Sequence, residues 1–397
     1  MKSIKLPAFF SAFALIFAGA LLAIFSDQDT PGLNVPSEFP TIEAALTQAQ
    51  PKDVIIVDAE KGPYQENLEI KVPDIEIKSS NGRAVIQARV AEKDVVRILA
   101  DNVKLSGFDI RRGATGILVE STFGVAIEDN HIQDQFGIGI MLFEAKHGQI
   151  GNNVIRGNIH GIWLSHESDD NVLIGNLVEK NVSMGLSLNS SNNNRITQNQ
   201  WLDHQTGINI SQSVTNTVSD NRINHNQTGL SINEAAGSNL FYDNELDGNS
   251  VGISLFNTHQ NVFERNQILN SLLEGVVAEV TSETQYRDNV FKDNQVGIRF
   301  VNSSNNTLEH NTIEANQTGV HLVGSSLNND IHQNNIFSNT SLGLSNDTLE
   351  LTYAENNYWG DASGARFSKD DAGDGDLIAG LVEFTPWLAE LVVLNAE

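Results

Sequence analysis

The residues best suited to chemistry lie in a short stretch where aromatic side chains stand beside carboxylates and imidazoles. The apolar members are Met141, Phe143 and Trp163, and the polar members just beyond them are Glu144, His166 and Glu167. Aromatic rings can stack on sugar rings, and carboxylates and imidazoles can transfer protons. We therefore expect the three apolar side chains and Glu167 to bind substrate, with His166 and Glu144 as catalytic candidates. An ordinary charged turn is the alternative interpretation.

Glu279 and Arg299 form a second catalytic candidate, because the repeat described below places them one coil apart on the same sheet. A Ca²⁺ ion prefers several convergent oxygen ligands, and a single glutamate does not supply them. A surface ion pair worth under about 1 kcal/mol is the alternative.

Metal ligands are suggested by a run of acidic residues close to the C-terminus, where Asp370, Asp371, Asp374 and Asp376 alternate with glycines. Such a loop could bind a hard cation, so Ca²⁺ is the candidate cofactor, although the spacing is not that of an EF-hand and a solvated turn is the alternative. Soft metals have few candidate ligands. The chain has no cysteine and three methionines, and its ten histidines are spread over many repeats, so a preformed copper cluster is not expected.

These residues are carried by a repeat, N-x-Φ-(x)5–6-G-Φ-x-Φ with Φ apolar, that extends from about residue 100 to residue 360. Its step of 22 or 23 residues is kept over more than ten copies, which is typical of a solenoid. The apolar residues alternate with period two, which indicates short strands and not helices. The repeated asparagines are Asn130, Asn153, Asn176, Asn199, Asn221, Asn244, Asn266, Asn289, Asn311, Asn334 and Asn356.

Three short strands per repeat predict an all-β fold, a right-handed parallel β-helix of about twelve coils. Strand spacing of about 4.8 Å would make the rod roughly 55–60 Å long. The asparagines are explained by structure, because side-chain amides can bond to a tight turn and to the amides of neighbouring coils. Alternation places every second residue of the G-Φ-x-Φ strand on the outer face, which is mostly serine and asparagine over residues 187–254.

The two ends of the chain depart from the repeat. The start resembles a signal peptide, because lysines precede a long uncharged apolar run, and the run at 6–25 is also long enough for a membrane anchor. A short helix, Thr41–Gln50, is expected to cap the open end of the rod. Tyr358, Trp359 and Trp387 are expected to close the other end. The expected divisions are 1–25 signal peptide or anchor, 26–37 linker, 38–110 cap and first coils, 111–360 repeat array, and 361–397 C-terminal cap.

The net charge of −26 bears on the partners of the protein. Binding of nucleic acid requires basic patches, so nucleic acid is not an expected ligand. An anionic polysaccharide would be repelled unless Ca²⁺ or a local basic cluster bridged the charges. We expect a polysaccharide or another glycan as partner, no lipid substrate, and a monomer.

The opening pattern T-I-x-x-A-L…D-x-I-x-V…G-x-Y-x-E-N-L, followed by the asparagine repeats, resembles the pectin-lyase-like right-handed β-helix superfamily. More narrowly, it resembles the parallel-β-helix-repeat proteins. The ending ENNYWGDASG, DDAGDGD and VEFTPWL is similar to that of many secreted proteins of this type, with alanine at 365 where proline is usual. These proteins include carbohydrate-binding and sugar-hydrolysing members and a periplasmic copper-processing branch.

The resemblance implies a reactive surface on the outside of one parallel sheet, but it does not supply catalytic residues. Related uronate epimerases carry a D-P-H motif after the corresponding glycine, whereas this chain reads G-I-W-L-S-H-E at 161–167. Related lyases use an arginine or lysine as base near Ca²⁺-binding acids, and a single arginine with a single glutamate does not match that arrangement.

The function predicted from the sequence is therefore that of an exported protein, periplasmic or extracellular, that binds or processes polysaccharide, with uronate-containing polymers among the candidates. As an enzyme it would be a polysaccharide lyase, an epimerase or a glycoside hydrolase. Two alternatives stay open: a non-catalytic surface or structural protein, and a periplasmic accessory protein that processes metal (copper).

Overall fold

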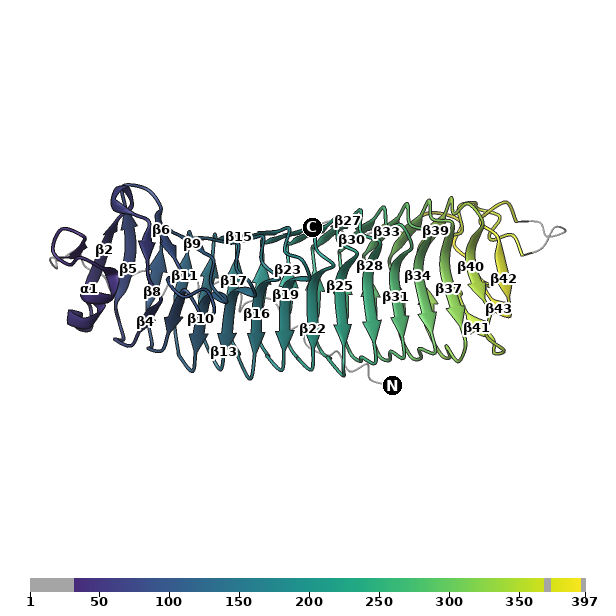
Figure 1. Ribbon diagram of the computed structural model, residues 1–397. Helices are drawn as coiled ribbons and strands as arrows, with labels where there is room; N and C mark the ends of the chain where they lie inside the picture. Colours follow the sequence, from purple (N-terminus) through teal and green to yellow (C-terminus); the bar gives the residue numbers. More distant parts are fainter. Residues whose placement is uncertain (1–31, 368–372, 394–397) are drawn as a thin grey trace.

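The computed structural model describes residues 32–367 and 373–393, which form one parallel β-solenoid (Figure 1). Three long sheets run along the rod, which we call sheets A, B and C. Sheets A and C contain 14 strands each and sheet B contains 13, so the solenoid has about fourteen coils and not the expected twelve. The difference arises because the stretch before the asparagine repeats, expected to be partly a cap, already forms complete coils.

The strands are short and follow one another in the order A, B and C around each coil. Sheet A contains β1 (Leu33–Val35), β2 (Val54–Asp58), β5 (Glu76–Ser80), β8 (Lys104–Ser106), β11 (Ala126–Glu128), β14 (Gln149–Gly151), β17 (Val172–Ile174), β20 (Arg195–Thr197), β23 (Thr217–Ser219), β26 (Leu240–Tyr242), β29 (Val262–Glu264), β32 (Gln285–Arg287), β35 (Thr307–Glu309) and β38 (Asp330–His332). Sheet B contains β3 (Tyr64–Gln65), β6 (Ala84–Gln87), β9 (Phe108–Arg111), β12 (His131–Gln133), β15 (Val154–Arg156), β18 (Leu177–Glu179), β21 (Gln200–Leu202), β24 (Arg222–Asn224), β27 (Glu245–Asp247), β30 (Gln267–Leu269), β33 (Val290–Lys292), β36 (Thr312–Glu314) and β39 (Asn335–Phe337). Sheet C contains β4 (Leu68–Ile70), β7 (Val96–Ile98), β10 (Thr115–Glu120), β13 (Ile138–Phe143), β16 (His160–Ser165), β19 (Met184–Asn189), β22 (Thr206–Ser211), β25 (Thr228–Asn233), β28 (Val251–Phe256), β31 (Glu274–Glu279), β34 (Val296–Val301), β37 (Thr318–Val323), β40 (Leu342–Asn346) and β42 (Ile378–Gly380).

Each strand pairs in parallel with its equivalent in the next coil, so residues of the same kind stack in columns. Ile127 pairs with Ile150 in sheet A, for example, and Ile140 pairs with Ile162 in sheet C. The columns that point inward are fully buried and form one continuous core. Period-two alternation then leaves every second side chain of a strand on the outside of the rod.

Three columns of polar side chains line the corners of the coils, where the sequence predicted one. In the predicted column, Asn221 Nδ2 donates to the carbonyl oxygen of Ile196 at 2.9 Å and to Asn244 Oδ1 at 3.0 Å. The second column begins five residues after the first, and the third lies five residues before it. The second column contains Gln135, Asn158, Asn181, His204, Asn226, Asn249, Ser271, Asn294, Asn316 and Asn339, and the third contains Asn171, Asn194, Asn216, Asn239, Asn261, Thr284, Asn306 and Asn329.

The last member of the first column is Asn357, and the assignment of Asn356 was wrong. Asn334 Nδ2 donates to Asn357 Oδ1 at 3.0 Å, whereas Asn356 adopts a left-handed turn conformation with φ 57°. The repeat step is either 22 or 23 residues, so both Asn356 and Asn357 lie at a permitted distance from Asn334. With the corrected register Trp359 enters the buried core, while Tyr358 is only partly buried.

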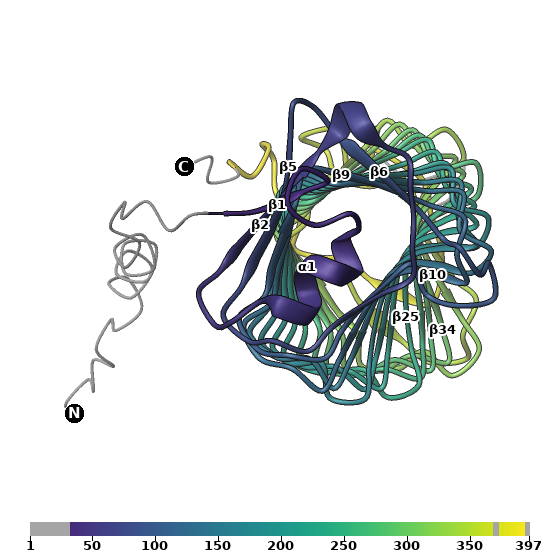
Figure 2. The same ribbon diagram turned by 60° about the vertical axis from the view of Figure 1, so that its left-hand side comes forward.

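A short helix, α1 (Ile42–Gln48), lies across the N-terminal end of the coils, as expected of a cap (Figure 2). Thr41 Oγ1 accepts a hydrogen bond from the backbone N–H of Ala44 at 3.0 Å, which caps the helix. The helix buries Ile42, Ala45 and Leu46 against the first coils. Strand β1 lies inside the stretch expected to be a linker, so the end of that stretch belongs to sheet A. The remaining short elements are η1 (Ala59–Lys61), β41 (Thr352–Tyr353) and β43 (Val382–Glu383).

The predicted signal peptide or anchor at 1–25 lies outside the described residues. Within 32–367 and 373–393, no helix has the length and apolar character needed to cross a membrane. At the C-terminal end, Trp359 is fully buried, and Trp387 Nε1 donates to the carbonyl oxygen of Ala362 at 3.1 Å. The expected aromatic C-terminal cap is thus present.

The second amide column contains a histidine, His204, in place of an asparagine. Its Nε2 accepts from Asn181 Nδ2 at 3.3 Å and its Nδ1 donates to Asn226 Oδ1 at 3.1 Å, so the hydrogen-bond network assigns the neutral Nδ1–H tautomer. A neutral imidazole therefore reproduces the side-chain contacts to the amide before it and the amide after it in the column. Burial lowers the pKa of His204 from 6.5 to about 4.

We predict that Asn221→Asp strongly destabilises the protein. A carboxylate at this position would face the carbonyl oxygens of Ile196 and Ser219, which now accept from Asn221 Nδ2 at 2.9 and 2.8 Å. Burying an uncompensated charge costs about 3 kcal/mol or more. Urea unfolding measures the change, with Ser231→Ala on the outer face as the control. Equal midpoints for the two variants would contradict the structural role of the column.

A second prediction concerns pH. Between pH 6.5 and about 4 the unfolded chain binds a proton at His204 that the folded chain does not bind, so the free energy of unfolding falls as the pH is lowered through this window. The loss amounts to about 3 kcal/mol. His204→Asn should remove it, and His321→Asn, on the outer surface, should not. Stability curves from pH 7 to 4 with the same slope in wild type and His204→Asn would refute the assignment.

Candidate functional site

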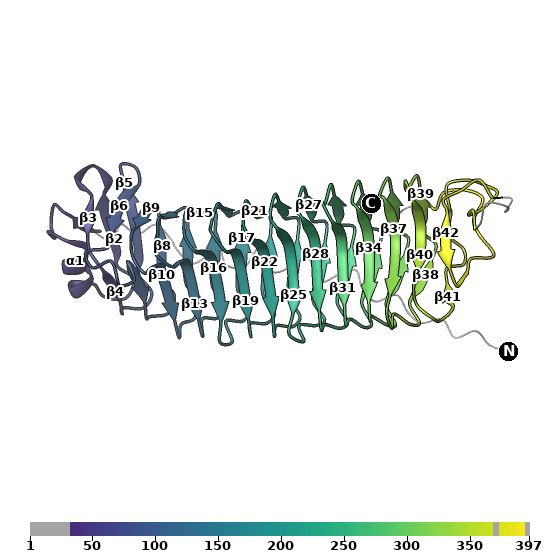
Figure 3. The same cartoon turned by 45° about the vertical axis from the view of Figure 1, so that its right-hand side comes forward.

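The strands of sheet C lie side by side along the rod (Figure 3), and their outer face carries the aromatic residues that the sequence singled out. Met141 and Phe143 on β13 and Trp163 on β16 are each partly exposed, while the residues that alternate with them, such as Leu142 and Ile162, are buried. Met141 lies beside Trp163 in the sheet register. The alternation expected from the sequence therefore holds at these coils.

The polar candidates lie at the edge of this aromatic surface, where the strands of sheet C end. The ring of His166 packs against that of Phe143 with centroids 4.4 Å apart. Glu144 Oε2 accepts a hydrogen bond from Ser121 Oγ at 2.8 Å, and Glu167 lies 3.8 Å from Lys146 Nζ. In the described structure no hydrogen bond joins Glu144 to His166. The arrangement offers a stacking surface with polar groups along one side, and their catalytic role stays a prediction.

Further apolar side chains extend this surface beyond what the sequence analysis found. Phe136, Ile159 and Val182 occupy the same corner of three successive coils and are 63%, 42% and 65% exposed. Two neighbours in that column, Gln205 and Gln227, are polar. The signal was available in the sequence, because these residues directly follow members of the second amide column, which was not recognised. We call the following residues the apolar face: Phe136, Met141, Phe143, Ile159, Trp163, Val182 and Met184.

His160 begins β16 and lies between the corner residues and Trp163. Its ring meets the ring of Trp163 edge-on, with centroids 5.0 Å apart and planes at 80°. His160 Nδ1 is buried and has no hydrogen-bond partner in the described structure. Burial also lowers the pKa of His160, which favours the neutral imidazole. A buried imidazole nitrogen without a partner is unusual in a folded protein.

The next coils of sheet C present small polar residues, as expected. Ser187, Asn209, Ser231 and Ser254 follow one another in register, one per coil. Ser187 is nonetheless largely covered although it lies in an outward column, so the outward position alone does not guarantee exposure. This part of the sheet offers hydroxyl and amide groups for hydrogen bonds.

The expected pair of Glu279 and Arg299 does not form. Arg299 Nη1 lies 3.2 Å from Glu274 Oε1 and is in register with Val277, whereas Glu279 is in register with Val301. Glu279 therefore lies two residues further along its strand than the arginine. Its acid–base role has no support from the geometry.

Of the four aspartates in the acidic loop close to the C-terminus, the structure describes Asp374 and Asp376. Asp370 and Asp371 lie outside the described residues. Asp376 Oδ2 accepts from the backbone N–H and from Nδ2 of Asn339 at 3.0 and 2.7 Å, so this carboxylate ends the second amide column. Burial raises the pKa of Asp376. Asp374 is exposed. No described group of three or more histidine or acidic residues could hold a metal ion, and Ca²⁺ stays a prediction.

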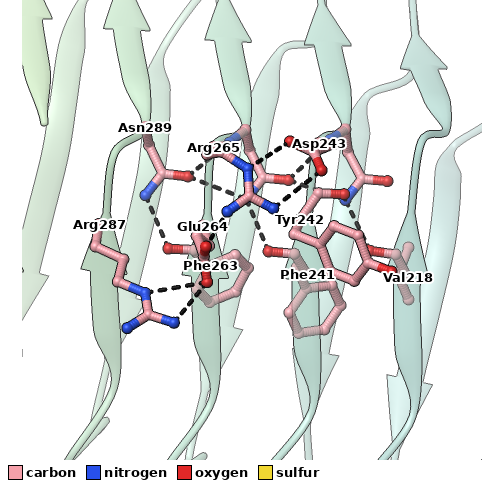
Figure 4. A network of polar contacts seen from close by, with 11 residues as sticks. Val218, Phe241, Tyr242, Asp243, Phe263, Glu264, Arg265, Arg287 and Asn289 are labelled. Carbon is pink, nitrogen blue, oxygen red and sulfur yellow. Dashed lines mark hydrogen bonds and ion pairs between the residues drawn. The ribbon is translucent and has the colours of Figure 1, made fainter. Parts of the chain in front are cut away.

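A second polar cluster lies on the outer face of sheet A and at its edge (Figure 4). Arg265 Nε is 2.9 Å from Asp243 Oδ1, and its guanidinium carbon is 5.8 Å from the centre of the Tyr242 ring. Arg287 Nη2 is 2.6 Å from Glu264 Oε2. Each arginine is engaged by a carboxylate of the preceding coil, so we interpret this cluster as bracing between coils.

Comparison with known proteins agrees with this fold. Residues 75–251 match a family described as periplasmic copper-binding protein (NosD), and residues 185–336 match one described as right handed beta helix region. Each match spans less than half of the chain. With the three parallel sheets, they show that the chain has the right-handed parallel β-helix fold.

Among solved structures, the periplasmic alginate epimerase AlgG has a TM-score of 0.51 at 16% identity, over 69% of this chain and 82% of that one. The A-module of mannuronan C-5 epimerase AlgE4 from Azotobacter vinelandii has a TM-score of 0.47 at 16% identity, over 72% of this chain and 92% of that one. A cell surface glycoprotein of Methanothermus fervidus is 32% identical over 125 residues, which are 32% of this chain and 21% of that protein. The chain thus spans about a fifth of the length of this curated relative.

Trp163→Ala should leave the fold intact, because Trp163 lies on an outward column and contributes little to the stacked core. We expect the free energy of unfolding to fall by about 1 kcal/mol at most. Trp201, which is fully buried in the core, is the matched control, and Trp201→Ala should cost about 3–5 kcal/mol. Chemical unfolding followed by circular dichroism measures both, and a loss of structure in Trp163→Ala would contradict the sheet register.

Proposed function

We propose that this is an exported protein that binds polysaccharide on the outer face of sheet C, with Trp163 at the centre of the site. The observation that carries the proposal is the partly exposed Trp163, placed beside Met141 and one coil from Phe143, with His166 against the Phe143 ring. Aromatic faces stack on sugar rings, and polar groups at their rim bond to hydroxyls. Trp163 and Phe143 supply the aromatic faces, and His166 supplies a polar group at their rim.

The neighbouring coils support the same proposal. The column that contains Trp163 continues through Ser187, Asn209, Ser231 and Ser254, with one residue in each coil. Coils repeat at about 4.8 Å, which is close to the length of a sugar unit, so a glycan chain lying along the rod beyond the covered Ser187 would meet one polar group per unit from Asn209 onward. Such small neutral groups bind hydroxyl-rich ligands without activating them.

Binding is better supported than turnover. Glu144 is engaged by Ser121, and His166 contacts Phe143, so the two acid–base candidates do not act on one another. Carbohydrate processing and a purely structural surface role are the alternatives, and the experiment below separates them. Export is supported by the signal-like N-terminus and by the matches, since one printed description is periplasmic and another names a cell surface protein.

Uronate polymers are candidates only together with a bridging cation. Glu144 and Glu167 lie at the edge of the apolar face. The nearby Lys146 forms an ion pair with Asp169, with 3.1 Å between Nζ and Oδ2. A polyuronate would therefore meet negative charge at this edge of the sheet. Ca²⁺ is the cation that we propose for that case.

The decisive experiment compares glycan binding by wild type, Trp163→Ala and Phe143→Ala. We expect each variant to bind at least about fivefold more weakly, because a stacked ring contributes about 1 kcal/mol or more. Phe256→Ala is the control, since Phe256 is exposed in the same column as Phe143 but lies several coils away. A glycan array and calorimetry, with neutral glycans and with uronates with and without Ca²⁺, supply the measurement.

Three results would count against parts of the proposal. Full binding by Trp163→Ala would move the site elsewhere, and no binding by wild type would favour a structural role. Formation of unsaturated or epimerised product would establish an enzyme.

A second candidate function is metal handling outside the cytoplasm. It is favoured by one observation, the match of residues 75–251 to periplasmic copper-binding proteins, a range that includes the whole apolar face. The sequence alone offered no cluster of soft ligands for such a role.

A further inference from the structure

Phe123 is an exposed aromatic residue that lies outside the apolar face. It is part of the corner between β10 of sheet C and β11 of sheet A, and it is 52% exposed. Its neighbour in the next coil is Lys146. In later coils the same corner column contains small, polar or aliphatic residues, which are Val214, Gly237, His259, Ser282 and Ser304. The fold therefore does not require an aromatic ring at this corner, and its exposure there is informative.

Three exposed aromatic residues lie on one diagonal across the neighbouring strands β16, β13 and β10 (Figure 1). Trp163 is in register with Met141, and Phe143 lies two residues beyond Met141 on the same strand. Phe143 is in register with Glu120, and Phe123 lies three residues beyond Glu120. Each step therefore goes back by one coil and onward by two or three residues towards the corner. We call Trp163, Phe143 and Phe123 the aromatic diagonal.

A histidine contacts each ring of the aromatic diagonal. The distances between ring centroids are 5.0 Å for Trp163 and His160, 4.4 Å for Phe143 and His166, and 4.6 Å for Phe123 and His147. His147 is itself close to a carboxylate, with 3.7 Å between its Nε2 and Asp170 Oδ2. Each aromatic ring is thus held by a neighbouring side chain, which reduces the entropy that it would lose on binding a ligand.

We infer that the aromatic diagonal binds a linear, neutral glycan, with Phe123 as a third stacking position that extends the site to the corner of sheet C. The inference rests on the glycan binding proposed above, and it adds the length and the charge class of the glycan. Strands advance about 3.3 Å per residue and coils about 4.8 Å, so neighbouring members of the diagonal are roughly 8–11 Å apart along the surface. This is about the length of two sugar units, so every second unit of a chain would meet a ring.

The polar groups beside the aromatic diagonal favour a neutral glycan. Glu144 is exposed, and its Oε2 accepts a hydrogen bond from Ser121 Oγ at 2.8 Å. Glu167 is exposed in the next coil. The nearby Lys146 is paired with Asp169, with 3.1 Å between Nζ and Oδ2, so it does not offset these acids. Carboxylates accept hydrogen bonds from sugar hydroxyls, but they repel the carboxylates or sulfates of an acidic glycan.

The aromatic diagonal and the polar column of sheet C lead away from Trp163 in different directions. The diagonal runs through β13 to β10, towards the N-terminal end of the rod, whereas the column runs through Asn209 and Ser231 towards the C-terminal end. A long glycan can therefore use both surfaces, with Trp163 at the point where they meet.

The test measures the length dependence of glycan binding by calorimetry, with cello-, xylo- and manno-oligosaccharides of two, four and six units as probes. In the wild type we expect the affinity for a bound series to rise with each step in length, because each added pair of units reaches another ring. Phe123→Ala should weaken binding of the hexasaccharide at least about fivefold and leave binding of the disaccharide unchanged. Phe123→Tyr keeps an aromatic ring and should bind the hexasaccharide within about twofold of the wild type.

Val214→Ala is the matched control, because Val214 is 39% exposed in the same corner column. This variant should bind every oligosaccharide as the wild type does. Phe123 is exposed, so Phe123→Ala should keep the circular dichroism spectrum and the urea midpoint of the wild type, which separates loss of stacking from loss of fold.

Contrary results would separate this inference from the proposed function. If Phe123→Ala binds the hexasaccharide normally while Trp163→Ala does not, the extension to Phe123 is wrong and the glycan site stands. If Trp163→Ala also binds normally, the proposed site is wrong as well. If the wild type binds hexagalacturonate without Ca²⁺ more tightly than it binds the neutral hexasaccharides, or binds none of the three neutral series, the assignment to a neutral glycan is wrong, and binding of other glycans would leave the proposed function standing.

Discussion

The constraint on which this structure depends is that every corner of every coil must satisfy its backbone hydrogen-bond groups inside the rod. Three columns of side-chain amides meet it, with asparagines donating to a carbonyl of the preceding coil and to the amide of the next coil, as Asn153 does to Ile127 at 2.9 Å and to Asn176 at 3.0 Å. A buried polar group without a partner is costly, so the columns tolerate little variation. His204 keeps side-chain contacts to both neighbouring amides of the second column, whereas Ser271 Oγ is buried without a hydrogen-bond partner in the described structure.

The same constraint confines variation to the outside. Inward positions are occupied by apolar core residues and corners by amides, which leaves the outward columns of the sheets free to change without loss of the fold. Along sheet C these columns are mostly small and polar, and the apolar face interrupts them over a few coils. An interruption of this kind on a regular solenoid is informative, because neither the core nor the corners require it.

The glycan proposal depends on the apolar face. Its rings are the groups proposed to stack on sugar rings, and polar side chains lie along one edge of it. Trp163 lies beside Met141 in the sheet register and in contact with His160.

The sequence by itself determined the solenoid, the strand alternation and the outward placement of Met141, Phe143 and Trp163, because a repeat of constant length imposes the same local conformation on each copy. The sequence did not decide between adjacent residues that both fit a step of 22 or 23 residues. Asn356 and Asn357 both fit the step, and only the hydrogen bond from Asn334 decides between them. It also left the second and third amide columns unrecognised, since they share the spacing of the first.

What the tertiary structure decided concerns residues in different coils. The partner of Arg299 is Glu274 and not Glu279, and Asp376 ends an amide column instead of standing free for a cation. Phe123 and His147 become neighbours for the same reason. Contacts across coils depend on the register between strands and on where each side chain leaves its strand, and a sequence pattern specifies neither to within the one residue that these contacts require.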